Sequence, residues 1–404
     1  MTVIVVGAGP AGLYAAELLA ERGNEVVVLE ASHHVGGRAH NGRFDGTEVE
    51  YGAGVGRWPY DRLLAAWMKK HGESVTPTVT HTRYWEDGEL MEHDDVLDVS
   101  REVEKIPLPT LAERRTTTFG AWLKKVFGNA YAKTFVFLSG YDDYTRADIV
   151  DTIEHYHFED VAPRTKTFLV HWTRLMEKSA AYLTSMGVRI LFHEQVTRID
   201  RTASDYLVHT KGHGHAYHAT QVVLAVPARP AHRILTASGY VKNAALLDHV
   251  KGQPFVRAYV KFGGDRNVVE KNVQTLMVCD SPFRKIIRMS NRHRVYMIAY
   301  CDNHHTQFWK DLLGLPKRTV CARIRDALTD AFDAPFVVSD AIIYYHQFGT
   351  HYYTPLPAPY LSRDAFVHDL VHVDDHVTIV GEAVSLNQGW TNGALESVVL
   401  NNVI

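Results

Sequence analysis

The sequence predicts an α/β protein in which a Rossmann-like dinucleotide-binding domain is interleaved with an α+β domain that has a mixed or antiparallel sheet and a helical insertion. Three observations support this fold class. A glycine-rich turn, GAGPAG, follows the first apolar run, strand patterns return with QVVLAVP, and one more buried strand, DHVTIV, lies near the C-terminus. We therefore expect residues 1–58, 187–235 and 368–404 to form the first domain, and residues 59–186 and 236–367 to form the second.

The N-terminal thirty residues read as strand, glycine-rich turn, helix, strand and acid. The apolar run VIVV predicts a strand that is buried on both faces, and EVVVLE predicts a second strand beside it. LYAAELLAERG predicts the helix between them, which ends at Gly23. This order is that of the βαβ unit that binds dinucleotides.

Each special position of this unit has a physical task. Gly7 makes the tight turn, Gly9 lets the backbone approach a pyrophosphate, and Gly12 lets the helix pack closely on the strand. The N-terminus of the helix offers free N–H groups to the phosphates. Glu30 ends the second strand, where its carboxylate can accept hydrogen bonds from ribose hydroxyls, and an acid at that place disfavours NADP.

Composition and charge exclude several classes of protein. The chain has 404 residues, of which 46% are apolar and 22% charged, and its formal net charge is −3. This charge gives no electrostatic case for nucleic acid or an anionic membrane as partner. No apolar run approaches the ~20 residues of a membrane helix, and the start MTVIVVGAGP lacks the character of a signal peptide. We expect a soluble, cytoplasmic protein that acts on a small molecule; the sequence leaves its oligomeric state open.

Cysteine and histidine usage gives no disulfide framework and no metal motif. The three cysteines match no zinc spacing, which favours free thiols. The run KGHGHAYH brings His213, His215 and His218 close together, but we interpret it as a solvated hairpin without a second set of ligands. We assign no metal.

The middle of the chain alternates between helical and strand patterns. PYDRLLAAWMKKHG and the stretches around 118–139 and 164–186 predict helices, and RYWEDGELMEH predicts a charged hairpin. PFVRAYVKF, RVYMIAYC and VVSDAIIYYHQF predict an antiparallel sheet that could serve as a substrate platform. The acidic and aromatic stretch 139–161 predicts an amphipathic helix pair with a solvated face; an acidic entrance for a cationic substrate is the alternative.

The N-terminal unit continues into ASHHVGGR and EVEYGAGVGRW. Together, GAGPAG, VVVLEAS, VGGR and EYGAGVG resemble the N-terminal signature of the flavin-containing amine oxidase superfamily, which includes monoamine, polyamine and L-amino acid oxidases. The resemblance implies a GR2-type domain that binds FAD, with the guanidinium of Arg38 against the pyrophosphate. Val196, in EQVTRID, falls in the segment that flanks the adenine in that family.

The resemblance also implies which residues hold the FAD. They come from the glycine-rich turn, the end of the second strand, the VGGR and EYGAGVG segments, the middle strand and the C-terminal element: Gly7, Gly9, Pro10, Ala11, Gly12, Glu30, Ala31, Gly37, Arg38, Gly54, Val55, Gly56, Arg57, Val196, Gly381, Glu382, Trp390, Thr391 and Ala394. Some members carry the flavin on a cysteine, but the corresponding stretch IIYYHQFGTHYYTP contains none, so we expect non-covalent FAD.

The C-terminal GWTNGALES resembles the family's Gly-aromatic-x-x-Gly-Ala element, which makes Trp390 one wall of an aromatic cage in front of the flavin. The opposite wall falls in FGTHYYTPLP, where either Tyr352 or Tyr353 faces the flavin, and the register leaves the choice open. Ordinary packing is the alternative for all three aromatic residues.

One position departs from the family pattern. In the family, the lysine that reaches flavin N5 through a water lies in a segment resembling PFVRAYVKF. This chain has Arg257 there, with Lys261 four residues later on the same face of the strand. Because an arginine is effectively never deprotonated, it does not copy every role of the lysine.

The resemblance implies an FAD-dependent amine oxidase that oxidises a C–N bond to an imine, with O₂ as acceptor and H₂O₂ as product. The chain has no second GxGxxG and no CxxC pair, which disfavours a reductase fed by a nicotinamide. Two alternatives stay open. One is a non-oxidase flavoenzyme on the same fold, a desaturase or a UDP-galactopyranose-mutase-like enzyme, although GVGRW stands where the mutase would have a histidine-containing loop. The other, kept open by Arg257, is a flavin-bound protein that has lost catalysis.

Overall fold

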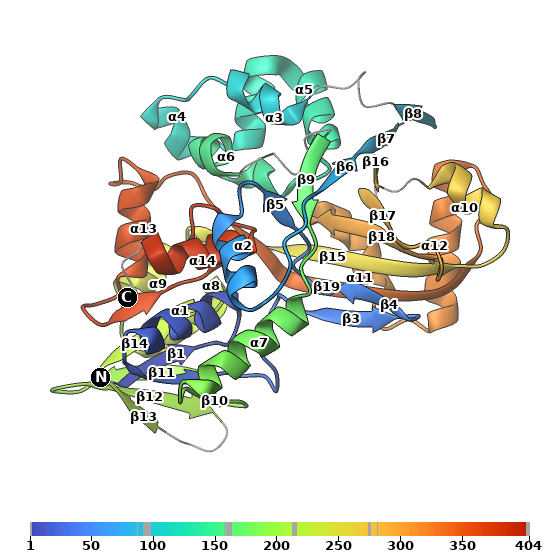
Figure 1. Ribbon diagram of the computed structural model, residues 1–404. Helices are drawn as coiled ribbons and strands as arrows, with labels where there is room; N and C mark the ends of the chain where they lie inside the picture. The colour runs from blue at the N-terminus through green and yellow to red at the C-terminus, as the bar shows by residue number, and fades with distance from the viewer. Residues whose placement is uncertain are drawn as a thin grey trace.

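The computed structural model describes residues 2–86, 88–91, 98–156, 158, 164–211, 216–273, 276–280 and 282–400. These residues form two large sheets, each covered by its own helices, and a helical layer at one end of the molecule (Figure 1). Parallel strands make up the first sheet and mostly antiparallel strands the second, which confirms the predicted fold class.

The first sheet is a five-stranded parallel sheet in the order β10-β2-β1-β14-β20. Its strands are β1 (Thr2–Val6), β2 (Glu25–Leu29), β10 (Arg189–Leu191), β14 (Gln221–Leu224) and β20 (Val377–Ile379). Strands from three distant parts of the chain therefore lie side by side, with the carboxyl ends of all five at one edge.

The strands of this sheet are mostly apolar because both faces of the sheet are covered. On one face Val3 and Val5 pack in a core with α1 (Pro10–Glu21), α2 (Arg62–Lys70), α7 (Trp172–Ser185) and α14 (Thr391–Leu400). On the other face Ile4 and Val6 pack in a second core. That core includes the small sheet of β11 (Gln195–Arg201), β12 (Tyr206–Lys211) and β13 (Ala216–Ala219), together with α8 (Ala228–Ala237), α9 (Val241–Leu247) and α13 (Arg363–Val371).

The second sheet has seven strands in the order β19-β15-β18-β17-β16-β7-β8. They are β7 (Arg83–Glu86), β8 (Glu89–Met91), β15 (Val250–Phe262), β16 (Leu276–Cys279), β17 (Lys285–Ser290), β18 (Val295–Asp302) and β19 (Val338–Tyr353). Only the β16–β7 pair is parallel, so the sheet is mixed. A core on one face joins it to α10 (Arg266–Asn272), α11 (Gln307–Leu312) and α12 (Lys317–Phe332).

The helical layer is an insertion between β8 and α7 (Figure 1). It contains α3 (Val99–Glu102), α4 (Leu111–Thr116), α5 (Phe119–Ser139) and α6 (Ile149–His155), with short 3₁₀ turns η2 (Val103–Lys105) and η3 (Asp143–Arg146). Gly128 interrupts α5 with φ 86°, which kinks the helix. Aromatic residues fill the core of this layer, among them Phe119, Phe135 and Tyr144.

Two small sheets complete the fold. One pairs β3 (Asn41–Phe44) with β4 (Thr47–Glu50), and the other joins β5 (Gly56–Trp58), β9 (Arg164–Phe168) and β6 (Thr78–His81). The predicted helix at 164–186 was therefore wrong at its start, where β9 pairs with β5 and β6 before α7 begins. Of the helices in the described part of the chain, none combines the length and the apolar character needed to cross a bilayer.

Candidate active site

A cavity of about 400 Å³ lies between the carboxyl edge of the parallel sheet and the second sheet. Gly7, Gly9 and Glu30, which follow β1 and β2, line what we call the nucleotide side. Phe255 and His346, from β15 and β19, with Tyr300 from β18, line what we call the aromatic side. Because ligands of open α/β sheets bind at the carboxyl ends of the strands, this cavity is the candidate active site.

The glycine-rich turn shapes the nucleotide side. Gly7 has φ +103°, and a Cβ at this position would lie 2.5 Å from the carbonyl oxygen of Ala225. A Cβ on Gly12 would collide with the carbonyl oxygen of Gly7, so α1 packs directly on the turn. Among the described residues, no heavy atom lies within 4 Å of the point where Gly9 would carry a Cβ. The turn thus leaves an open cradle at the N-terminus of α1, where free N–H groups and the helix dipole favour a phosphate.

Glu30 holds its carboxylate at the edge of the same cavity. One carboxylate oxygen accepts a hydrogen bond from the backbone N–H of Ala8 at 2.7 Å, and the other accepts one from the N–H of Ser32 at 2.8 Å. These two bonds fix the carboxylate, and its remaining lone pairs can accept hydrogen bonds from a ribose.

A charged cluster of Arg38, Glu382 and His351 joins the nucleotide side to β19. Nη1 of Arg38 donates to the carbonyl oxygen of Gly349 at 2.7 Å and lies 3.0 Å from Oε2 of Glu382. The carboxylate of Glu382 also accepts hydrogen bonds from the backbone N–H of His351 and of Gly389, both at 2.9 Å, and contacts Nδ1 of His351 at 2.9 Å.

This cluster keeps Glu382 ionised although its side chain is buried. Burial by itself would raise the pKa of Glu382. The charges of His351 and Arg38 and the hydrogen bonds from His351 and Gly389 outweigh that effect and lower the pKa to about 2. The anionic Glu382 in turn fixes the guanidinium of Arg38, which is still one-third exposed and lines the cavity.

Most of the residues predicted to hold the cofactor line this one cavity. They are Gly7, Gly9, Pro10, Ala11, Glu30, Ala31, Gly37, Arg38, Gly54, Val55, Val196, Gly381, Glu382, Trp390, Thr391 and Ala394. Gly12, Gly56 and Arg57 are absent from the lining. Gly12 supports α1 against the turn, and Gly56 lies where a Cβ would collide with the ring of Phe168, so both serve packing.

Arg57 lies behind Trp390 rather than in the cavity. Its guanidinium carbon is 3.9 Å from the centroid of the Trp390 ring, a cation–π contact. The buried carboxylate of Asp61 pairs with Nη2 of Arg57 at 2.7 Å. Arg57 thus fixes the plane of Trp390, which lines the cavity at the entry to α14.

The structure places Tyr352 and Tyr353 outside the lining of the cavity. Tyr353 is 1% exposed and packs in the core behind the parallel sheet, with the guanidinium of Arg363 at 4.5 Å from its ring centroid. Tyr352 lines a separate small pocket of about 30 Å³ together with Tyr144 and His351. Neither tyrosine therefore lies where the sequence placed the second wall of an aromatic cage.

The register of β19 explains this placement. Gln253 pairs with Thr350, whereas Phe255, two residues later on β15, pairs with His346, so β19 has two extra residues opposite Pro254. A proline has no N–H to donate, and strands commonly bulge at such a position. The bulge brings His346, Gly349 and Thr350 to the cavity and leaves Tyr352 beyond it.

The three strands of the aromatic side were predicted as a substrate platform, but the individual residues Phe255, Tyr300 and His346 were not predicted. Phe255 and Tyr300 form an edge-to-face pair with ring centroids 5.1 Å apart, and His346 lies beside Phe255 at 6.4 Å. A signal for Phe255 was present, because strand alternation puts it on the same face as Arg257. Tyr300 and His346 gave no such signal, since their approach depends on the pairing of β18 and β19 with β15.

Arg257 is buried behind the wall of the cavity. Its Nε donates to the carbonyl oxygen of Gly52 at 2.7 Å, and its guanidinium carbon lies 4.2 Å from the ring centroid of Tyr300. Nη2 has no hydrogen-bond partner among the described residues, and a Cβ on Gly54 would lie only 2.6 Å from it. Lys261 does not reach the site, because its Nζ pairs with Asp45 at 2.9 Å.

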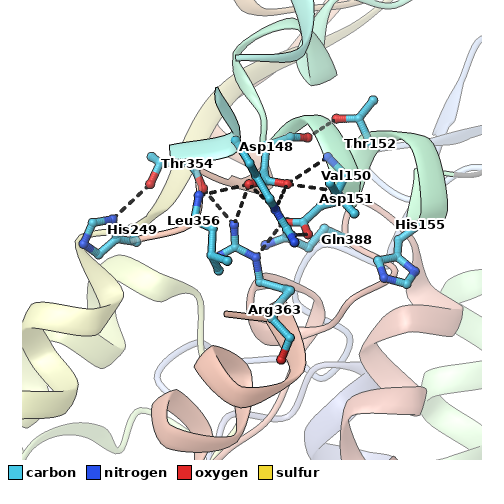
Figure 2. Close-up of polar contacts among 12 residues, drawn as sticks. Asp148, Val150, Asp151, Thr152, His155, His249, Thr354, Leu356, Arg363 and Gln388 are labelled. Carbon is cyan, nitrogen blue, oxygen red and sulfur yellow. Dashed lines mark hydrogen bonds and ion pairs between the residues drawn. The ribbon is translucent and has the colours of Figure 1, made fainter. Parts of the chain in front are cut away.

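The acidic stretch of the helical insertion is tied down by arginines. Asp148 caps α6 by accepting hydrogen bonds from the N–H groups of Val150 and Asp151, and it also accepts one from the N–H of Leu356 at 2.9 Å. Figure 2 shows Arg363, from α13, pointing toward Asp148 and Asp151; its Nε donates to Asp151 at 2.6 Å. Arg114 pairs with the same two carboxylates. These acids anchor the insertion to the chain after β19; residues 157 and 159–161 of the stretch lie outside the described part.

The cavity fits FAD on its own geometry. It has an open cradle at a helix N-terminus, a fixed carboxylate at the end of β2 and an arginine that is held by Glu382 yet still exposed. All three cysteines are described, and none of them lines the cavity, which agrees with a non-covalent cofactor.

Comparisons with known proteins agree with this geometry. The family model for flavin containing amine oxidoreductases matches residues 10–398. Putrescine oxidase from Kocuria rosea is 52% identical over 56 residues, 14% of this chain and 11% of that protein. Polyamine oxidase 1 from Zea mays is 52% identical over 52 residues, 13% of this chain and 10% of that protein.

Longer matches cover more of the chain at lower identity. The putative flavin-containing monoamine oxidase AofH from Mycobacterium tuberculosis is 28% identical over 275 residues, 57% of this chain and 58% of that protein. The alignments thus span between about a tenth and somewhat over half of the length of these curated relatives. A solved structure of a putrescine oxidase triple mutant, redesigned in cofactor binding, superposes with a TM-score of 0.76 at 16% identity and 98% coverage of both chains, which shows the shared fold.

The glycine-rich turn, the cavity at the carboxyl edge and the match over nearly the whole chain lead to one conclusion: this chain belongs to the family of flavin-containing amine oxidoreductases, with FAD as its cofactor.

Proposed function

We propose that this chain is an amine oxidase that uses non-covalent FAD to oxidise the C–N bond of a small amine to an imine, with O₂ as acceptor and H₂O₂ as product. The observation that carries the proposal is the continuous lining of one cavity by the dinucleotide turn, Trp390 and the aromatic side. We further propose that residues 1–58, 187–235 and 368–404 form the FAD domain and that 59–186 and 236–367 form the substrate domain. A cytoplasmic location is part of the same proposal.

The nucleotide side supplies the groups that would hold FAD. Gly9 and the N-terminus of α1 would receive the pyrophosphate together with Arg38, and Glu30 would accept the hydrogen bonds of the ribose. Val196, Gly381 and Thr391 line the same cavity and would complete the contacts. FAD held there would supply the two-electron oxidation of the C–N bond, with O₂ as the proposed electron acceptor.

The aromatic side would orient the substrate and exclude water. Amines react as neutral bases, and an apolar aromatic lining favours the neutral form over the ammonium ion. Burial lowers the pKa of His346, and its Nε2 lies 2.7 Å from the carbonyl oxygen of Tyr51. A neutral imidazole that donates through Nε2 keeps Nδ1 as an acceptor, so His346 can receive a hydrogen bond from the amine.

A peroxide-coupled screen of the FAD-loaded protein tests the proposal with monoamines, diamines, polyamines and L-amino acids. We expect at least one amine to give H₂O₂, and we expect Trp390→Ala to lower kcat/KM for it by about a hundredfold, because the ring that lines the cavity is lost. Trp85→Phe, which alters a tryptophan on β7 outside the cavity lining, is the matched control. Silence across the panel with flavin bound would refute the proposed activity.

Arg257 favours a second candidate, a flavin protein on this fold that does not act as an oxidase. A permanent cation stands where the family pattern has a lysine, and it is buried behind Gly54 rather than exposed to the cavity. Photoreduction of the bound flavin followed by exposure to air separates the two candidates. Reoxidation within seconds supports the oxidase, whereas reoxidation over many minutes, accelerated by Arg257→Lys, supports the second candidate.

A further inference from the structure

Three metal-ligating side chains meet outside the candidate active site, where the end of α5 approaches the end of β18. Asp142 follows α5, and His304 and His305 lie in the 3₁₀ turn η5 (Asn303–Thr306) directly after β18. One ligand atom from each lies within 4.8 Å of the others. The segments are 160 residues apart in sequence and are held together by the N–H of Asp142, which donates to Asp302 at 3.2 Å.

The geometry of this cluster is close to that of a metal site. Nδ1 of His304 contacts Oδ2 of Asp142, and Nε2 of His305 lies 3.9 Å from the same oxygen. The two imidazole rings have centroids 3.9 Å apart. In a tetrahedral site each ligand atom lies about 2.0–2.1 Å from the Zn²⁺, so the ligand atoms are about 3.3 Å from one another. Small side-chain adjustments would bring the three ligand atoms of the cluster to this spacing.

The backbone presents both histidines on one side. Asn303 has φ 49°, a left-handed conformation that asparagine tolerates better than most residues. It turns the chain at the end of β18, and the Sγ of Cys301 contacts the carbonyl oxygen of His305 at 3.6 Å. The turn is thus fixed by the fold before any ligand binds.

A buried polar atom without a partner lies at this cluster. Asp142 is 3% exposed, and its Oδ1 has no hydrogen-bond partner among the described residues. Buried polar atoms are almost always satisfied in native proteins, and a cation held by both oxygens of Asp142 would satisfy this one.

The charge of the cluster also favours a cation. Asp142 and the fully buried Asp302 bring two carboxyl groups together; the positive charge of Arg284 acts on both, and that of Arg146 acts on Asp142. No ion pair within 4.0 Å links Arg284 to either aspartate in the described structure, and its Nη2 donates to the carbonyl oxygen of Val136 instead. Burying a carboxylate is costly even where a histidine contacts it, as His304 contacts Asp142, and a bound cation would reduce that cost.

We propose that Asp142, His304 and His305 form a binding site for a divalent transition-metal ion of the Zn²⁺ class. Two imidazoles and one carboxylate suit zinc, whereas Ca²⁺ and Mg²⁺ require oxygen ligands. The side chain of His304 is 67% exposed and gives the ion a path from solvent.

The bound ion would join the helical insertion to the strand that carries Tyr300. Asp142 lies on the insertion, and β18 places Tyr300 in the cavity lining two residues before Asp302. The site is therefore a cross-link between the two elements rather than part of the flavin chemistry. The inference does not depend on the proposed oxidase activity.

The test uses the full, FAD-loaded chain without a polyhistidine tag. After incubation with ZnSO₄ and desalting, we expect elemental analysis to find about one zinc per chain, and the melting temperature to rise with zinc. The double variant His304→Ala/His305→Ala should retain less than about a tenth of that zinc and lose the zinc-dependent shift in melting temperature. The matched control, His171→Ala/His218→Ala, removes two exposed histidines that pair with Glu48 and Asp205, and it should retain all of the zinc.

Two further measurements test the proposal even if the double variant does not fold. His304→Gln changes only an exposed side chain and should weaken zinc retention at least about tenfold. Co²⁺ in the wild-type protein should give the visible absorption of a tetrahedral site and lose it on addition of Zn²⁺. The proposal is overturned if the wild-type protein retains no zinc after desalting, or if the ligand variants retain as much as the control.

Discussion

The two sides of the cavity differ in how their walls are encoded. The nucleotide side is built from short segments whose backbone conformation is decided locally, by Gly7, Gly12 and the end of β2. The aromatic side brings together Phe255, Tyr300 and His346 through the register of three long strands. The residues of the nucleotide side can therefore be predicted from short sequence motifs. The residues of the aromatic side cannot, because their positions depend on strand pairing between distant parts of the chain.

We expect the largest loss of stability and of flavin binding from a substitution at Gly12, where α1 packs most closely on the glycine-rich turn. In Gly12→Ala the new Cβ collides with the carbonyl oxygen of Gly7 and also approaches the Cβ of Ala225 to 3.1 Å, so α1 cannot remain on the turn. We expect a protein without bound flavin and with lost cooperative melting. Flavin absorbance after gel filtration and a thermal melt measure this.

Gly9→Ala is the matched change on the cavity face of the same turn. Its Cβ would meet no described atom within 4 Å, so the fold should melt as in the wild type in the absence of FAD. The methyl group occupies the cradle, and we expect FAD affinity to fall at least about tenfold, which corresponds to about 1.4 kcal/mol. Equal damage by both changes would contradict the assignment of separate tasks to the two glycines.

The second effect concerns the anchor of the helical insertion. Asp148→Ala removes a fully buried carboxylate. This carboxylate accepts hydrogen bonds from two N–H groups of α6, from the N–H of Leu356 and from the guanidinium of Arg114. Removing one partner of a buried charge network costs about 3–5 kcal/mol. We expect the free energy of unfolding to fall by this amount while FAD still binds, because Asp148 lies outside the cavity lining.

Urea unfolding of the FAD-loaded protein, followed separately by tryptophan and flavin fluorescence, measures this change. Asp326→Ala is the control, because Asp326 is an exposed partner of its neighbour Arg325 and surface pairs contribute about 0–1 kcal/mol. If flavin fluorescence and tryptophan fluorescence change together, the helical insertion and the flavin site unfold as one unit.

The third prediction concerns the charged cluster of Arg38, Glu382 and His351. The folded pKa of Glu382 is about 2, below its usual value of 4.5. A depressed pKa contributes stability that is complete above about pH 4.5 and is lost as the pH falls toward 2. The difference corresponds to about 3 kcal/mol.

In Glu382→Gln we therefore expect lower stability at pH 7 and a flatter dependence of stability on pH between about 4.5 and 2. Acid titration of FAD-loaded protein by circular dichroism measures both. Glu154→Gln, at an exposed position on α6, is the control and should leave the acid transition in place. If the acid transition of Glu382→Gln is the same as that of the wild type, other carboxylates govern acid unfolding.

The sequence predicted the nucleotide side of the cavity better than the aromatic side. GAGPAG, VGGR and the C-terminal GWTNGALES specify tight turns and helix starts, and most of the residues predicted from them line one cavity. Tyr352 and Tyr353 were placed by counting along a strand, and a bulge opposite Pro254 moved the cavity wall to His346. The cluster of Asp142, His304 and His305 joins two segments with no motif of their own, so only the fold reveals it.

The smallest expected effect distinguishes the observed aromatic side from the one that the sequence suggested. Tyr300→Phe removes the hydroxyl of a tyrosine that lines the cavity and whose ring centroid lies 4.2 Å from the guanidinium of Arg257 and 5.5 Å from Nζ of Lys285. We expect kcat/KM for the best amine to fall by about tenfold, or about 1.4 kcal/mol of transition-state stabilisation. Tyr352→Phe makes the same chemical change in the small pocket beyond the cavity and should leave kcat/KM within about twofold. Steady-state peroxide assays on both variants decide the question, since a larger loss in Tyr352→Phe would return the substrate wall to the end of β19.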